Sequence, residues 1–117
     1  AKAYAGICYY HLGEYEKAID FLSGFDADDD YISVMAVGLM GDSYAELGDA
    51  DKAVKFFMKA AESENDVLSP LYLKKAGIVY ESEGDNKKAL ENYLSIKNDY
   101  PMSIENQDID KYIARLQ

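Results

Sequence analysis

The side chains best suited to nucleophilic catalysis or metal binding are few, because the sequence has one histidine, His11, and one cysteine, Cys8. A single residue of each type cannot form a His–His ligand pair, a multi-cysteine zinc site or an internal disulfide. No serine or aspartate stands at a spacing that would complete a catalytic triad around His11. We therefore expect His11 to lie at a helix end near a turn, and Cys8 to be a buried structural thiol.

The acidic run at residues 26–30 invites a calcium interpretation, because aspartates at alternate positions open an EF-hand loop. That loop requires glycine at its sixth position and glutamate at its twelfth, where this chain has Tyr31 and Val37. We expect instead a solvated linker whose last residue, Asp30, caps the following helix. The glycines are isolated, so no phosphate-binding loop is indicated, and we expect no metal, no cofactor and no enzyme activity.

The charge balance points away from nucleic acid. The chain has 22 acidic and 12 basic residues and a net charge of −10, whereas phosphate binding relies on clustered lysine and arginine. The same charge disfavours an anionic membrane and favours basic partners. The longest nearly apolar run, residues 32–41, is shorter than the roughly 18 residues of a membrane span, so we expect no direct insertion by this segment. Since the chain begins at Ala1 within a helical pattern, we expect it to be a piece of a longer protein.

One six-residue phrase occurs three times and sets the organisation of the chain. Each copy, at residues 13–18, 48–53 and 84–89, begins with glycine followed by an acidic residue and ends in Lys-Ala. The glycines stand 35 and 36 residues apart. A fixed period of this size predicts an array of helical hairpins. The glycine is expected to cap the first helix in a left-handed conformation, and the following acid to favour the start of the second.

The periodic apolar residues predict helices at about 1–12, from 14 to a stop at Gly24, and at about 31–47, which is the most apolar element. Residues 63–69 are expected to be a polar connector with Pro70 near a helix start, and Pro101 is expected to end the third pair. The tail at 103–117 carries the stripe Ile109, Tyr112, Ile113 and Leu116. It predicts a closing helix that shields the last hairpin, with a free peptide-binding helix as the alternative.

The recurring positions around these turns carry a family resemblance over roughly residues 1–101. The three copies share a small residue and a tyrosine in the first helix and an alanine and a bulky residue in the second: Gly6, Tyr9, Ala18, Leu22; Gly41, Tyr44, Ala53, Phe57; Gly77, Tyr80, Ala89, Tyr93, with Pro101 at the end. This pattern resembles the tetratricopeptide repeat (TPR), a helix-turn-helix unit of about 34 residues. The chain departs from that family in having no tryptophan, and in having Asp30 and Asn65 where a proline would stand.

The resemblance implies an all-α fold, a right-handed α-solenoid of three TPR helix-turn-helix hairpins plus a C-terminal capping helix, with about seven helices. It implies a single domain at 1–117, with repeats at about 1–30, 31–66 and 67–101 and the capping helix at about 103–117. First helices of such repeats line a concave groove. Mapped onto this chain, the groove residues are Ala3, Ile7, Tyr10, Met35, Gly38, Asp42, Ala45, Leu71, Lys74, Ile78 and Glu81.

The resemblance further implies a non-catalytic interaction module that binds a peptide or protein segment in this groove. Members that bind chaperone tails hold a terminal carboxylate with Lys, Asn and Arg, but Ala3, Ile7, Gly38 and Asp42 stand at the first clamp positions here. We therefore do not expect that specialised function. The alternative is a structural role, in which the repeats form a homo-oligomer or space a membrane anchor from other domains.

Three phrases, at residues 1–9, 68–70 and 108–113, are also similar to tetratricopeptide proteins of Bacteroides-type bacteria. Members of that group resemble the ancillary subunit of the bacterial secretion channel. They typically carry one upstream transmembrane helix. This similarity implies a parent protein anchored in the inner membrane, with the repeats on the periplasmic side.

Overall fold

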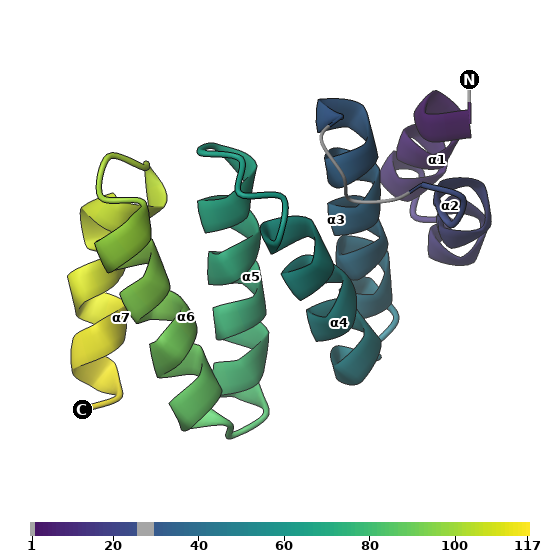
Figure 1. Ribbon diagram of the computed structural model, residues 1–117. Helices are drawn as coiled ribbons and strands as arrows, with labels where there is room; N and C mark the ends of the chain where they lie inside the picture. The colour runs from purple at the N-terminus through teal and green to yellow at the C-terminus, as the bar shows by residue number, and fades with distance from the viewer. Residues whose placement is uncertain (1, 26–29) are drawn as a thin grey trace.

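The structure is a computed structural model that describes residues 2–25 and 30–117, and these residues form helices and connecting turns with no strand (Figure 1). The elements are α1 (Lys2–His11), α2 (Tyr15–Leu22), α3 (Tyr31–Glu46), α4 (Ala50–Ala61), α5 (Leu68–Ser82), α6 (Asn86–Asp99), the short 3₁₀ helix η1 (Glu105–Asp108) and α7 (Ile109–Arg115). The described residues therefore contain seven α-helices, and the all-α prediction is confirmed.

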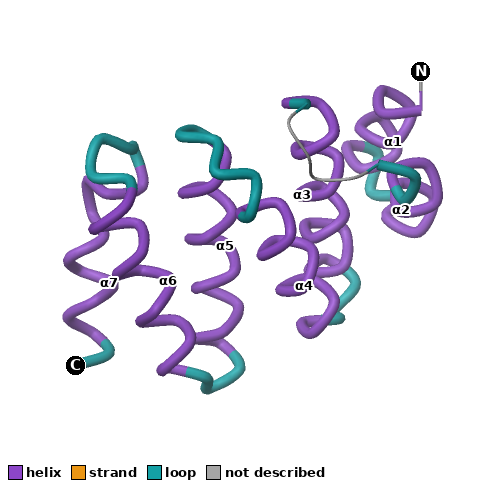
Figure 2. Tube along the Cα trace, in the orientation of Figure 1, coloured by secondary structure: helices purple, strands orange, loops and turns teal. Residues whose placement is uncertain are grey.

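Successive helices pair into hairpins α1/α2, α3/α4 and α5/α6 that stand side by side, with α7 at the end of the row (Figures 1 and 2). The first helices of neighbouring hairpins contact one another: α1 contacts α3, and α3 contacts α5. The second helices lie farther apart: among the described residues no close backbone contact joins α2 to α4 or α4 to α6, although the Asn92 side chain of α6 donates to the Met58 sulfur of α4 at 3.3 Å. The row therefore curves with α1, α3 and α5 on its inner side, as expected of a helical solenoid.

Each first helix ends at a glycine in the left-handed conformation. In the second hairpin Gly48 has a φ of 83°, and the N–H of Asp49 donates to the carbonyl of Tyr44 at 2.9 Å. This six-to-one bond is the Schellman arrangement, in which a side chain at the glycine position would be strained. The other hairpins repeat it, with φ values of 79° at Gly13 and 83° at Gly84.

In two hairpins the acidic residue after the glycine stabilises the start of the second helix by a hydrogen bond as well as by its charge. The carboxylate of Asp49 accepts a hydrogen bond from the N–H of Lys52 at 3.1 Å, and Asp85 accepts from the N–H of Lys88 at 3.2 Å. Asp49 is thus the N-cap of α4 and Asp85 the N-cap of α6, each the second helix of its hairpin. Glu14, one methylene longer, makes no such bond and pairs with the Lys17 ammonium at 3.6 Å instead.

Asp30 caps α3, as predicted, because its carboxylate accepts from the N–H of Ile32 at 3.1 Å. The rest of the acidic run considered for calcium, residues 26–29, lies outside the described residues. Helix α5 begins at Leu68, inside the stretch expected to be a connector. The Asn65 side chain accepts from the N–H groups of Val67 and Leu68 at 2.9 and 2.8 Å, so the start of this helix is capped without the family's proline.

The core is built on a close contact between a glycine of the first helix and a bulky residue of the second. A Cβ atom on Gly41 would lie 2.5 Å from Cδ1 of the buried Phe57 ring, which is too close for any real contact. The equivalent distance is 2.5 Å from Gly6 to Leu22 Cγ and 2.6 Å from Gly77 to Tyr93 Cε1. The alanines Ala18, Ala53 and Ala89 beside them are fully buried, so the predicted packing positions are confirmed in all three hairpins.

The end of the chain closes the row rather than remaining free. Ile109 and Ile113 of α7 are buried in the same core cluster as Tyr93 and Ile96, and Tyr112 and Leu116 pack against it. The closing-helix prediction is therefore confirmed, although the helix is shorter than residues 103–117. Ser103 and Asn106 bond instead to the turn that follows α6.

We expect Gly41→Ala to lower the free energy of unfolding by about 1–3 kcal/mol, because the new methyl group overlaps a buried ring with no room to move. Chemical denaturation followed by circular dichroism measures the change. Gly24→Ala is the matched control, since a Cβ there has nothing within 4 Å and no positive φ is involved. Equal losses in the two variants would contradict the proposed contact.

Candidate functional site

The inner face of α1, α3 and α5 holds the residues predicted to line a groove, and the structure divides them into three groups. Ala3 and Gly38 are buried. Gly38 lies directly beneath the ring of Tyr72 from the next hairpin, so a Cβ at this position would collide with that ring. These two residues present no side chain to a partner and serve the packing of neighbouring helices.

The charged members of the set are engaged in contacts between hairpins. Lys75 donates to Asp42 at 2.7 Å across α3 and α5, and Lys74 donates to Asp108 at 2.9 Å. Glu81 accepts from the Arg115 guanidinium at 2.9 and 3.1 Å. The Lys75–Asp42 pair joins α5 to α3, and the other two pairs join α5 to the closing segment of η1 and α7. Their role in the free chain is to hold the inner face together.

The two ends of this network differ in their electrostatics. Burial raises the pKa of the Asp42 carboxyl above its ordinary value, even though Lys75 acts in the opposite direction. The hydrogen bond from Arg115 lowers the pKa of the Glu81 carboxyl, and the Tyr93 hydroxyl, which donates to Glu81 at 2.9 Å, acts in the same sense. Only a carboxylate with a lowered pKa adds stability at neutral pH.

The third group is apolar and accessible. Ile7, Tyr10, Met35 and Leu71 are half-buried, while Ala45 and Ile78 are exposed, Ile78 to 45%. Tyr10 stacks edge-on against Tyr15 with ring centroids 5.5 Å apart, which fixes its orientation. The part of the predicted groove that remains available to a partner is therefore a set of hydrophobic side chains.

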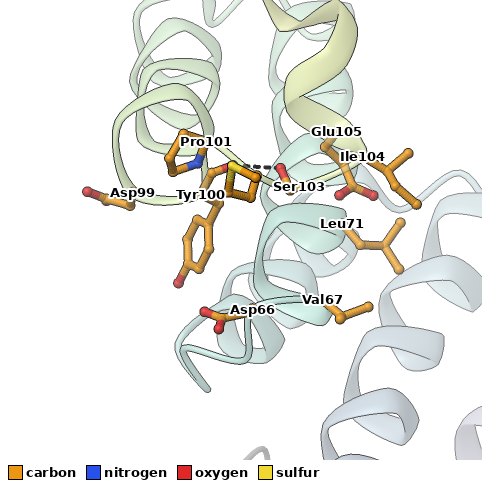
Figure 3. Close-up of a pocket in the computed structure, with 10 residues that line it drawn as sticks. Asp66, Val67, Leu71, Asp99, Tyr100, Pro101, Ser103, Ile104 and Glu105 are labelled. Carbon is orange, nitrogen blue, oxygen red and sulfur yellow. Dashed lines mark hydrogen bonds between the residues drawn. The ribbon is translucent and has the colours of Figure 1, made fainter.

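The structure adds a pocket that the sequence analysis missed. A cavity of about 450 Å³ opens where the start of α5 meets the turn after α6, and Leu71 is the one predicted groove residue in it (Figure 3). The other lining residues are Asp66, Val67, Asp99, Tyr100, Pro101, Met102, Ser103, Ile104 and Glu105. One signal was present in the sequence: Val67 precedes Leu71 by four residues, the spacing of neighbours on one helix face.

The two residues considered for catalysis, His11 and Cys8, both belong to α1. His11 is the last residue of α1, as predicted. Cys8 was expected to be buried, but that prediction is wrong, because the thiol is exposed. Helix α1 buries Ala3 and Gly6 against its neighbours, and Cys8, two residues after Gly6, points to a different side of the helix.

The described part of the chain contains no group of three His, Cys, Asp or Glu residues that could hold a metal ion. In residues 2–25 and 30–117 there is also no helix with the length and hydrophobicity needed to cross a membrane.

The geometry defines the class of protein, an α-solenoid of three helical hairpins closed by a terminal helix. Two stretches match family models described as tetratricopeptide repeat, at residues 36–67 and 4–25. No curated protein matches the chain. The matches support a tetratricopeptide repeat protein, a kind of repeat that is generally a non-catalytic interaction scaffold. The narrower resemblance to membrane-anchored proteins of Bacteroides-type bacteria stays a prediction.

The lowered pKa of Glu81 predicts a loss of stability in acid. A carboxyl whose pKa falls below its ordinary 4.5 on folding stabilises the native state above that pH, and this contribution disappears as the pH drops through the folded-state pKa. We expect Glu81→Gln to be less stable than the parent at pH 7 and to lose less stability between pH 5 and 3. Urea unfolding across this range measures the slope. The exposed Glu91→Gln on α6 is the control, and a parent-like slope in Glu81→Gln would contradict the prediction.

The exposed Cys8 predicts rapid labelling in the native state. Because it is the only cysteine, the reaction with a chromogenic disulfide reagent reports on this thiol alone. We expect the rate in native buffer to be within about tenfold of the rate in denaturant, whereas a buried thiol waits for unfolding. A native rate lower by several orders of magnitude would restore the buried assignment.

Proposed function

We propose that this protein is a non-catalytic interaction module that binds a segment of another protein along the inner face of its helical row. The observation that carries the proposal is an apolar stripe on α5. Val67, Leu71 and Ile78 stand at helical spacing on one side of this helix. Val67 and Ile78 are exposed and Leu71 is half-buried, while the opposite side of α5 is packed into the core through Tyr72, Leu73 and Ala76.

The network beneath this stripe supports a preformed binding surface. Lys74, next to Ile78 on the inner face, bonds to Asp108, and Lys75 bonds to Asp42. With the helices already held in register, a partner segment loses its own freedom on binding but does not need to order the surface that receives it. Tetratricopeptide repeats are generally protein–protein interaction modules, which agrees with this proposal.

Recognition in this proposal depends on apolar anchors rather than on a terminal carboxylate. The positions corresponding to the first clamp groups are Ala3, Ile7, Gly38 and Asp42. Ala3 and Gly38 are buried, Ile7 is apolar, and Asp42 is an acid paired with Lys75. None of the four is a donor that could hold a carboxylate. A segment that presents large hydrophobic side chains at intervals fits the accessible residues better.

The structural alternative, self-association of the repeats or spacing of a membrane anchor, draws support from the exposed Tyr4 and Leu12 on the first hairpin. The net charge of −10 opposes close association of two identical copies. Binding of a different protein is therefore the first proposal.

The test uses a photoreactive amino acid at Ala45, an exposed residue of the inner face, in cells that make the protein. We expect a discrete crosslinked product that is lost, by about tenfold, when Ile78 is changed to Asp, because a charge replaces an apolar contact. Leu47→Asp is the matched control: Leu47 is exposed to 44%, compared with 45% for Ile78, but lies in the turn after α3. The same product in equal yield from Ile78→Asp would overturn the proposal.

A further inference from the structure

The pocket at the start of α5 joins hydrophobic and acidic side chains from the beginning of that helix and from the segment that follows α6. Val67 and Leu71 come from the beginning of α5, and Met102 and Ile104 come from the turn between α6 and η1. Figure 3 shows Ile104, Leu71 and Val67 lying on the same side of the pocket, with Glu105 beside Ile104, Asp66 between Val67 and the Tyr100 ring, and Asp99 on the far side of Tyr100. Its volume of about 450 Å³ is that of sites which enclose a small ligand or a large side chain.

We propose that this pocket receives a hydrophobic anchor side chain from the partner segment, and that lysine or arginine residues flank the anchor in that segment. The inference rests on the proposed function and extends it, because Leu71 belongs both to the pocket and to the α5 stripe. In this proposal the side chains of the pocket determine which partner segments the protein binds.

The charge of the lining argues for basic residues in the partner. Asp66, Asp99 and Glu105 contribute three carboxylates, and no lysine, arginine or histidine lines the pocket. Within the described residues none of these three side chains makes an ion pair or hydrogen bond, in contrast with Asp42, Glu81 and Asp108. Unpaired carboxylates around an apolar centre are complementary to a cationic segment and repel an acidic one.

Asp99 strengthens the charge argument through its position. It is the last residue of α6, where the negative end of the helix dipole disfavours a carboxylate. The carboxylate has no basic side chain bonded to it in the described part of the chain, because Lys97, the basic residue in the last turn of α6, bonds to Asp110 instead. A cation supplied by a partner would pair with Asp99.

The hydrophobic part of the pocket is both exposed and preformed. Met102 is exposed to 95% and Ile104 to 77%, although large apolar side chains are usually covered when they lie close together. The turn that carries them is fixed, because Ser103 donates to the Tyr100 carbonyl at 2.7 Å (Figure 3). Asn106 also donates to the Pro101 carbonyl at 2.8 Å. Met102 adds an adaptable thioether that can fit anchors of different shape.

A second copy of the chain is a poorer occupant than a basic segment. Each copy carries 22 acidic and 12 basic residues, so its approach to an acidic pocket is opposed by like charge. Nucleic acid and anionic lipid are disfavoured for the same reason, since the pocket offers no cation to a phosphate.

The test is selection from a library of random linear peptides displayed on phage, with the intact protein as bait and Ile104→Asp for counter-selection. We expect the recovered peptides to share one large apolar residue with lysine or arginine nearby. Recovery of peptides that lack basic residues, or that bind Ile104→Asp equally well, would overturn the proposal, as would the absence of any selected peptide.

The strongest selected peptide is then labelled and its affinity measured by fluorescence polarisation. We expect Ile104→Asp to weaken binding by about tenfold or more, and Asp66→Lys/Asp99→Lys to weaken it by about three- to tenfold while reducing its salt dependence. The control Leu12→Asp is matched in exposure, 72% compared with 77%, but lies on the first hairpin. Its affinity should stay within about twofold of the parent.

The two proposals fail in different ways. If Ile78→Asp abolishes the crosslink from Ala45 while Ile104→Asp leaves it intact, the inner face binds a partner and the pocket proposal is wrong. If neither change affects the crosslink and Ile104→Asp dissociates a dimer in sedimentation, the pocket binds a second copy and both proposals are wrong.

Discussion

The stack depends on the absence of a side chain at three positions. Gly6, Gly41 and Gly77 leave space into which Leu22, Phe57 and Tyr93 insert, so the two helices of each hairpin approach closely and exclude water from the bulky residue. Any Cβ at these glycines would overlap atoms that have nowhere to move. The distance between the two helices of each hairpin follows from this contact.

A second layer of contacts holds the hairpins to one another. Tyr72 covers Gly38 of the preceding hairpin, and Lys75 reaches back to Asp42 in the same interface. At the far end, Arg115 of α7 bonds to Glu81 of α5. Residues that sequence mapping places in a binding groove thus serve first to align the helices, and the surface left for a partner is the apolar remainder.

Much of the fold could be predicted from the chain. The period between Gly13, Gly48 and Gly84 identified the hairpins, because a turn with positive φ strongly favours glycine. The accessibility of single side chains was less predictable. Cys8 lies between Gly6 and Tyr9 in a helical pattern and was expected to be buried, yet burial depends on which neighbouring helix covers that side of α1. Met102 and Ile104 were missed because they come from the turn after α6, which has no periodic pattern, and Val67 was missed because it was assigned to the polar connector before α5.

The sequence by itself determined the local structure: where the hairpin turns lie, which small and bulky residues pack together in each hairpin, and the repeat that makes the chain a solenoid. These properties depend on residues within a few turns of each other, so they are written in the spacing of glycine, alanine and aromatic residues. Only the tertiary structure decided which groove residues are paired or buried and which remain free. It also brought residues 66–71 and 99–105 together into one acidic, apolar pocket. Those outcomes require contacts between distant segments, whose geometry no local pattern encodes.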